Sequence, residues 1–170
     1  IYLCFSFLFI SLISTAQTAQ HDAYIEEFYE IAIAEMQRAG IPASIKLAQG
    51  ILESGIGKSE LAKNANNHFG IKCGNDWIGE TYYIIDDDRD ESGKLIKSCF
   101  RVFESPQESY IEHTEFLSNP KKAFRYGELF RLDKTDYKGW AKGLKKAGYA
   151  TNPNYPKLLI TVIENNDLAQ

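Results

Sequence analysis

One carboxylate, Glu53, lies within an otherwise apolar stretch of this sequence. The stretch covers residues 47–58 and reads LAQGILESGIGK. Its apolar residues have the spacing of a wide buried face of a helix, and Glu53 follows them directly, just before a Gly-rich exit that should end the helix. The residues with this spacing are Leu47, Ala48, Ile51 and Leu52.

This position suggests acid chemistry for Glu53. Burial near the end of a helix removes water from the carboxylate and raises its pKa. The negative end of the helix dipole raises the pKa further. A carboxyl group with a raised pKa can act as a general acid near neutral pH. The alternative is a solvated charge at a helix end, and the local sequence leaves both interpretations open.

A second group of acids covers residues 86–91, which read DDDRDE. The block lies between two segments with strand-like alternation, so most of its side chains are expected on a solvated turn. The alternative to a solvated turn is a calcium site, because calcium prefers oxygen donors. The block lacks the glycine and the final glutamate of an EF-hand loop, so no metal site is predicted.

Cys73 and Cys99 flank the same predicted hairpin. An oxidising compartment would permit a disulfide between them, but strand register decides whether they meet, and the sequence leaves the pairing open. Zinc is not expected, because the three histidines show no C-x-x-C or H-x-x-x-H spacing. These histidines are His21, His68 and His113.

Residues 1–19 differ in composition from the rest of the chain. Residues 3–13 are almost continuously apolar, and small residues follow them. The run is shorter than the ~20 apolar residues of a membrane-spanning helix. We therefore predict a secretory signal peptide with cleavage after Ala16 or Ala19, truncated at its start because an initial Met and a basic segment are missing.

The signal peptide has consequences for localisation. Residues 20–170 are expected to form an exported protein of the periplasm, cell wall or extracellular space, with no stable membrane anchor after cleavage. An uncleaved anchor is the alternative. Cys4 has no lipobox in front of it, so a lipoprotein is not expected.

Length, net charge and aromatic content limit the remaining function classes. The length of 170 residues suggests a single domain with a real core. The net charge is −4 and there is no basic run, so a nucleic-acid partner is not favoured. Ten Tyr and ten Phe are many for this length, and they suit a cleft for sugars, although aromatic residues are first of all core residues.

The order of predicted elements indicates the fold class. Residues 69–103 alternate and are rich in β-branched and aromatic residues, which predicts two or three antiparallel strands, with the best segments at 82–85 and 95–102. Helices flank this region on both sides. We expect a mainly α (α+β) domain, in which a helical lobe and a small antiparallel β-hairpin lobe form a cleft. Helices or helical turns are predicted at 22–39, 42–54, 59–63, 106–118, 124–130, 135–147 and 155–165.

Four short segments are informative as a set. Residues 49–57 read QGILESGIG and residues 67–72 read NHFGIK. Residues 100–103 read FRVF, and residues 148–155 read GYATNPNY. In order and approximate spacing they resemble the motifs of the bacterial N-acetylglucosaminidases of glycoside hydrolase family 73, which include the flagellar peptidoglycan hydrolase and several autolysins. The resemblance covers about residues 25–165.

The resemblance implies a lysozyme-like helical lobe, with the sugar chain held between it and the β-lobe. It implies that Glu53 is the general acid and that Tyr149 orients the acetamido group of the substrate or the acid itself. The family's second acid is a Glu on the β-lobe, which is missing here. Counting forward from Trp77 places Asp88 at that position, with Asp87 or Asp90 as alternatives.

Other residues in these segments are expected to contact the substrate or to hold the loop. Phe69 could equally be core, and Asn67 and Lys72 could equally serve loop structure. Tyr83 could stack on a sugar ring or pack in the hairpin. Tyr155 is expected to pack at a helix start rather than to take part in catalysis. The expected substrate contacts are Asn67, Phe69, Lys72 and Tyr83.

The implied function is that of a secreted, monomeric peptidoglycan hydrolase without a cofactor. It would cleave the β-1,4 bond after N-acetylglucosamine in the glycan strands. An inverting mechanism needs two carboxyl groups roughly 6.5–9.5 Å apart, whereas a substrate-assisted mechanism uses the acetamido group, and the sequence leaves this choice open. Two other functions remain as alternatives, a lytic transglycosylase and a catalytically silent peptidoglycan-binding module.

Overall fold

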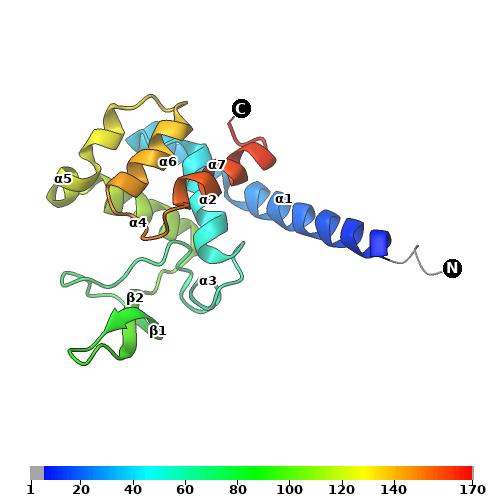
Figure 1. The fold of residues 1–170 in the computed structure, drawn as a ribbon. Coiled ribbons are helices and arrows are strands. Elements are labelled where there is room, and N and C mark those ends of the chain that lie inside the picture. The colour runs from blue at the N-terminus through cyan, green and yellow to red at the C-terminus, as the bar shows by residue number, and fades with distance from the viewer. Residues whose placement is uncertain (1–5, 170) are drawn as a thin grey trace.

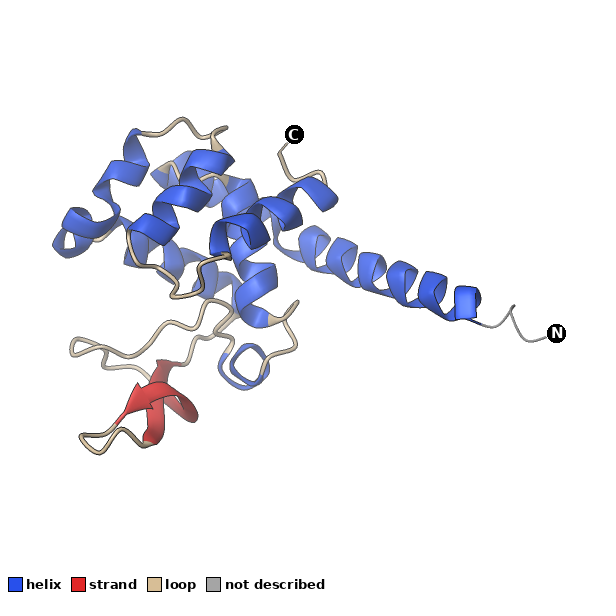
Figure 2. Cartoon of the chain, in the orientation of Figure 1, coloured by secondary structure: helices blue, strands red, loops and turns tan. Residues whose placement is uncertain are grey.

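The computed structural model describes the backbone of residues 6–169 and the side chains of residues 19–169. Helices make up one lobe, and two antiparallel strands make up the other (Figures 1 and 2). The predicted fold class is therefore confirmed. The elements are α1 (Ser6–Ala39), α2 (Ala43–Ser54), α3 (Glu60–Ala65), β1 (Thr81–Arg89), β2 (Leu95–Arg101), α4 (Pro106–Ser118), the 3-10 turn η1 (Pro120–Lys122), α5 (Ala123–Tyr126), η2 (Gly127–Arg131), α6 (Tyr137–Lys146) and α7 (Tyr155–Asn165).

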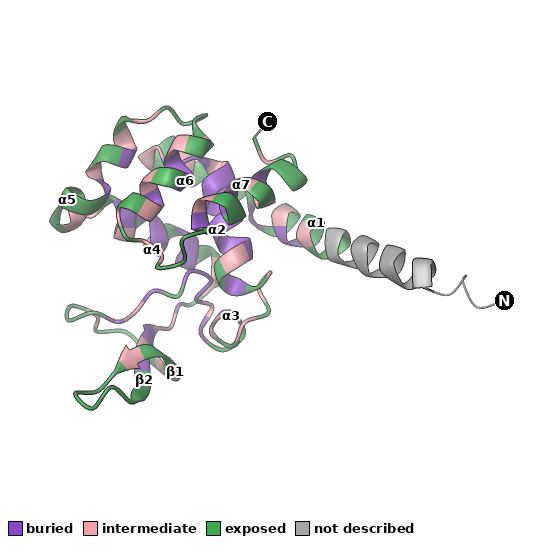
Figure 3. Ribbon diagram, in the orientation of Figure 1, coloured by how far each residue is buried: buried purple, intermediate pink, exposed green. Residues whose placement is uncertain are grey.

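Helix α2 lies at the centre of the helical lobe. Every residue from Ser44 to Ile51 is buried, so the helix is covered on all sides (Figure 3). One apolar cluster joins α2 to α6 and α7, and a second joins it to α1 and α4. Because both clusters share α2, the position of this helix depends on the packing of the whole lobe.

Helix α1 is longer than the sequence predicted. It begins at Ser6 and runs without a break to Ala39, whereas the prediction began at residue 22. Its first half projects away from the rest of the molecule (Figure 1). Residues 1–5 of the predicted signal peptide lie outside the described residues. None of the helices described here is long and apolar enough to cross a membrane.

The remaining helices follow the predicted pattern closely. α4 and α7 have the predicted bounds, and Ser105 caps α4 by accepting a hydrogen bond from the N–H of Glu108. Ser59 caps α3 in the same way. The segment predicted as one short helix or turn at 124–130 is divided between α5 and η2, and the turn η1 directly precedes them.

The β-lobe is a two-stranded hairpin. Strand β1 pairs with β2 in an antiparallel register that places Tyr83 opposite Cys99. An irregularity interrupts the pairing between Ile85 and Arg89. The prediction that residues 86–91 form a turn was wrong in its boundaries, because the acids up to Asp88 belong to β1 and the turn begins at Asp90.

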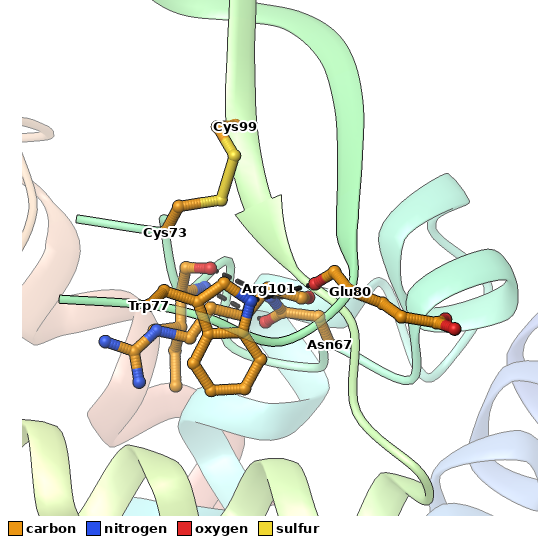
Figure 4. The surroundings of a disulfide bond; sticks show 7 residues. Asn67, Cys73, Trp77, Glu80, Cys99 and Arg101 are labelled. Atoms are coloured by element: carbon orange, nitrogen blue, oxygen red, sulfur yellow. Dashed lines mark hydrogen bonds between the residues drawn. A yellow bond between two sulfur atoms is a disulfide. The ribbon is translucent and has the colours of Figure 1, made fainter. Parts of the chain in front are cut away.

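The loop between α3 and β1 is tied to the hairpin by several contacts (Figure 4). A disulfide joins Cys73 to Cys99, with their Cα atoms 5.5 Å apart. The Asn67 amide donates to the carbonyl oxygens of Ile71 and Arg101, both at 2.9 Å, and accepts from the Ile71 N–H. These bonds hold the loop against β2, and the loop forms one wall of the cleft described below.

A glycine at position 50 is required by the packing of α2. A Cβ there would overlap the hydroxyl of Tyr110 and would lie 2.6 Å from that of Tyr24. We expect Gly50→Ala to lower the free energy of unfolding by about 1–3 kcal/mol, although alanine is the better helix former. Urea denaturation checks this.

Gly127→Ala is the matched control for this substitution. Gly127 has a helical φ of −58°, and an added Cβ would meet the Ala123 Cβ at an ordinary 3.8 Å. This variant should be unchanged or slightly more stable. Equal stability of the two variants would contradict the packing argument.

Candidate active site

A cleft of about 700 Å³ lies between the helical lobe and the β-lobe. Glu53 lines it from the end of α2, and Lys72 lines it from the loop before β1. The segment before α7 contributes Tyr149 and Asn152. The other lining residues are Leu52, Leu61, Phe69, Gly70, Ile71, Asp86, Asp87, Phe100, His113, Phe116, Arg125, Tyr126, Ala150, Thr151, Tyr155 and Leu158.

Glu53 reaches the cleft because α2 ends immediately after it. Gly55 adopts the left-handed conformation with φ 55°, and its N–H bonds to the Ile51 carbonyl. The Ser54 hydroxyl donates to the Gly50 carbonyl and accepts from the Gly57 N–H. The last turn of the helix is thus fixed, and Glu53 is the carboxylate that α2 presents to the cleft.

The Glu53 carboxyl is open to the cleft and is partly desolvated by the cleft walls. Its side chain is exposed, so a substrate can reach it. The walls of the cleft surround it, and this desolvation raises its pKa. A hydrogen bond from the Tyr155 hydroxyl to Glu53 Oε1, at 2.7 Å, opposes the shift without cancelling it. The direction of this pKa shift agrees with the expectation from the sequence.

Tyr155 is held in a chain of hydrogen bonds that begins in the core. Gln49 Nε2 donates to the Tyr155 hydroxyl at 3.0 Å, and the hydroxyl donates its own proton to Glu53. Tyr155 is buried. The prediction that Tyr155 only packs at a helix start missed this bond. The signal was the spacing of Gln49 and Glu53, which places both on one face of α2.

Tyr149 lies beside Tyr155, with the two ring centroids 5.8 Å apart. Its hydroxyl lies 3.1 Å from Nε2 of the buried His113. Desolvation, with Glu53 as the next contribution, raises the Tyr149 pKa well above its ordinary value, so the phenol stays neutral. The structure therefore places the two tyrosines and Glu53 together on the cleft.

The acids of β1 meet the ammonium group of Lys72. Lys72 Nζ lies 2.6 Å from Asp87, 2.7 Å from Asp88 and 3.7 Å from Asp86. The hydrogen bond from Lys72 holds the pKa of Asp87 and of Asp88 below the ordinary range. Asp86 and Asp87 line the cleft, but the predicted second acid, Asp88, is absent from its lining. Asp90 is engaged in the hairpin turn.

The residues predicted to contact substrate separate into two groups. Phe69 and Lys72 line the cleft, and Phe69 stacks on His113 with ring centroids 4.1 Å apart. Asn67 is buried and all its bonds go to backbone, so its role is structural. Tyr83 is 55% exposed on β1 and does not line the cleft. Among the described residues, no group of three or more His, Cys, Asp and Glu side chains could hold a metal ion.

The fold and the cleft define a lysozyme-like domain, with one desolvated carboxyl between a helical lobe and a β-hairpin. A family model described as glucosaminidase, mannosyl-glycoprotein endo-β-N-acetylglucosaminidase, matches residues 29–168. The chain belongs to this family, glycoside hydrolase family 73, as the four motifs predicted.

Curated relatives agree with this assignment. The chain is 32% identical over 156 residues to the exo-glucosaminidase LytG of Bacillus subtilis, a match that covers 91% of this chain and 54% of the relative. It is 31% identical over 134 residues to the peptidoglycan hydrolase FlgJ of Escherichia coli, covering 75% and 41%. The chain thus spans about half the length of the curated relatives it matches.

Solved structures share the fold. The catalytic domain of the autolysin Auto from Listeria monocytogenes superposes with a TM-score of 0.77 at 27% identity, covering 89% of this chain and 86% of that one. The glycoside hydrolase domain of FlgJ from Salmonella typhimurium gives a TM-score of 0.66 at 27% identity, covering 86% and 88%.

Tyr155 provides a test of the electrostatics of the site. Its hydrogen bond stabilises the ionised form of Glu53, so Tyr155→Phe should raise the pKa of Glu53 further. The alkaline limb of the pH–rate profile should then move to higher pH, with a loss of maximal rate of about tenfold or less, the size of one hydrogen bond. Clearing of purified sacculi across a pH series measures both.

Tyr137→Phe is the matched control, because Tyr137 donates to Glu164 in the same way on the surface, away from the cleft. Its profile should equal that of the unchanged chain. An alkaline limb that stays in place or moves to lower pH in Tyr155→Phe would contradict the assignment of this limb to Glu53.

Proposed function

We propose that this chain is an exported peptidoglycan hydrolase that cleaves the β-1,4 bond after N-acetylglucosamine in glycan strands, with Glu53 as the general acid. The supporting observation is the Glu53 carboxyl itself, desolvated yet reachable and hydrogen-bonded to Tyr155. The family assignment and the names of the relatives, exo-glucosaminidase and peptidoglycan hydrolase, support the reaction and the substrate. The apolar segment at residues 3–13 supports export as the route to that substrate.

Glu53 has the properties that the first step requires. Its raised pKa leaves a larger protonated fraction at any given pH than an ordinary glutamate has, and this proton passes to the glycosidic oxygen as the bond to the anomeric carbon breaks. The carboxylate that remains is the form that the Tyr155 hydroxyl stabilises, because an ionised acceptor makes the stronger hydrogen bond. Tyr155 therefore favours proton release in the transition state.

For the second step we favour assistance by the substrate. The carbonyl oxygen of the acetamido group bonds to the anomeric carbon while the glycosidic oxygen leaves with the proton of Glu53. Water then opens the resulting ring, with the Glu53 carboxylate as the base. The observation behind this choice is Lys72, which binds Asp87 and Asp88 and lowers the pKa of both. A base with a lowered pKa is a poor proton acceptor near neutral pH. Tyr149 is placed to steady the acetamido group.

Glu53→Gln tests the general acid. The amide keeps the shape of the side chain but has no acidic proton, so we expect the clearing of purified sacculi to fall about 10²–10⁴-fold while binding to them is retained. Mass spectrometry of the products of the unchanged chain should show reducing N-acetylglucosamine ends.

Three results would contradict this proposal. If Glu53→Gln clears sacculi as fast as the unchanged chain, Glu53 is not the acid. Products with 1,6-anhydro ends would identify a lytic transglycosylase. Binding of the unchanged chain without any cleavage would identify a catalytically silent peptidoglycan-binding module.

The acids of β1 test the second step. If the substrate assists, single substitutions Asp86→Asn, Asp87→Asn and Asp88→Asn should each retain activity within about tenfold, because none of them takes the proton of water. Asp90→Asn in the hairpin turn is the control. Initial rates on sacculi measure the effect. A loss in one of the three that equals the loss in Glu53→Gln would identify that residue as the base of an inverting mechanism.

A further inference from the structure

A lysine lies in the middle of the core, on the helix that carries Glu53. Lys46 is fully buried, and its Nζ has three partners on α4. They are the Tyr110 carbonyl oxygen at 2.7 Å, Thr114 Oγ1 at 2.6 Å and His113 Nδ1 at 3.3 Å. A buried ammonium group is costly even when it is paired, and an apolar residue would fill this space at a lower cost. Stability alone therefore does not account for Lys46.

The partners of Lys46 fix the direction of each hydrogen bond. The Thr114 hydroxyl donates its own proton to the Tyr110 carbonyl, so it accepts from Lys46. An ammonium group has three protons and no lone pair, so His113 Nδ1 also accepts. The proton of the neutral imidazole is then on Nε2, which donates to the Tyr149 hydroxyl at 3.1 Å.

This arrangement leaves the proton of Tyr149 free. The hydroxyl oxygen accepts from His113, so its own O–H can point into the cleft. Phe69 stacks on the imidazole at 4.1 Å with an interplanar angle of 10°, which keeps the ring from turning. Lys46 and Tyr149 are therefore connected through a single oriented imidazole.

We propose that Lys46, acting through His113, directs the hydroxyl proton of Tyr149 into the cleft and is thus a positioning residue for glycan cleavage. The effect on cleavage rests on the function proposed above. The direction of the hydrogen bonds does not, because it follows from the contacts of His113 with a charged Lys46.

The same contacts reverse when Lys46 loses its charge. The neutral amine keeps two protons for the Tyr110 carbonyl and Thr114, and its lone pair then accepts a proton from His113 Nδ1. His113 Nε2 becomes an acceptor, and the Tyr149 proton turns away from the cleft toward it. Burial lowers the pKa of Lys46 to about 7, so the reversal falls near neutral pH.

The charged and titratable neighbours do not replace Lys46 in this role. Burial holds the pKa of His113 well below its ordinary value, so the ring changes its tautomer and not its charge. From α1, the Glu35 carboxylate favours the charged form of Lys46, and Arg38 opposes it. Arg38 is itself paired with Glu35 and with Glu115 of α4. The groups that face Tyr149 are Glu53, Tyr126, Tyr155 and His113.

The tautomer of His113 is the direct test. Nitrogen NMR of the full chain labelled with ¹⁵N-histidine distinguishes Nδ1–H from Nε2–H, and His113→Gln assigns the signal among the three histidines. From about pH 5 to about pH 9 we expect a change from the Nε2–H to the Nδ1–H form, with its midpoint near the pKa of Lys46. In Lys46→Met the pH dependence should vanish. The Nδ1–H form at about pH 5, or a change that persists in Lys46→Met, would overturn the proposal.

Kinetics test the consequence for cleavage. Lys46→Met should lower kcat on sacculi about tenfold near pH 6, the size of one misdirected hydrogen bond, and leave KM unchanged. In a Tyr149→Phe background, which has no hydroxyl to direct, the same substitution should have almost no effect. Equal losses in both backgrounds would overturn the proposal.

A control and a separate readout keep this test distinct from that of the proposed function. His68→Gln removes the other buried histidine, which contacts Tyr24 and lies outside the cleft lining, and it should leave kcat unchanged. If the unchanged chain cleaves no peptidoglycan at any pH, the proposed function fails, while the tautomer measurement still decides the role of Lys46.

Discussion

The structure depends on the burial of helix α2, because the polar side chains on a helix covered on all sides need partners inside the protein. Gln49 Nε2 has such a partner, whereas Gln49 Oε1 is buried without one. Lys46, Gln49 and Glu53 lie on one face of this helix, at spacings of three and four residues. Lys46 and Gln49 find their partners in neighbouring segments, and each set of partners ends at a tyrosine of the cleft. The hydrogen bonds that offset the cost of burying Lys46 and Gln49 are therefore the same ones that orient Tyr149 and Tyr155.

The two lobes contribute different chemical groups to the cleft. The helical lobe supplies Glu53 with a raised pKa, because its walls exclude water. The β-lobe is held by the disulfide and by Asn67, and it supplies acids that Lys72 neutralises. A proton donor on one side and paired acids on the other suit a mechanism in which a single protein carboxyl transfers the proton and the substrate supplies the nucleophile.

Much of the fold could be predicted from the sequence, because periodicity and caps are local. The bounds of α4 and α7, the cap at Ser59 and the position of Glu53 all follow from neighbouring residues. The cluster around Lys72 could not be predicted, because it depends on an irregularity in β1 that changes which acids face the cleft. The bond from Tyr155 to Glu53 joins residues 102 positions apart, and the local spacing that places Gln49 and Glu53 on one face of α2 does not identify Tyr155 as their partner.

The walls of the cleft desolvate Glu53 and keep it protonated to a higher pH than an ordinary glutamate. Carbon NMR of the side-chain carboxyl, followed through a pH titration of the unchanged chain and assigned with Glu53→Gln, measures this directly. The structure predicts a midpoint for Glu53 above the ordinary range of glutamate. A midpoint within or below that range would show that the cleft does not raise the pKa of Glu53.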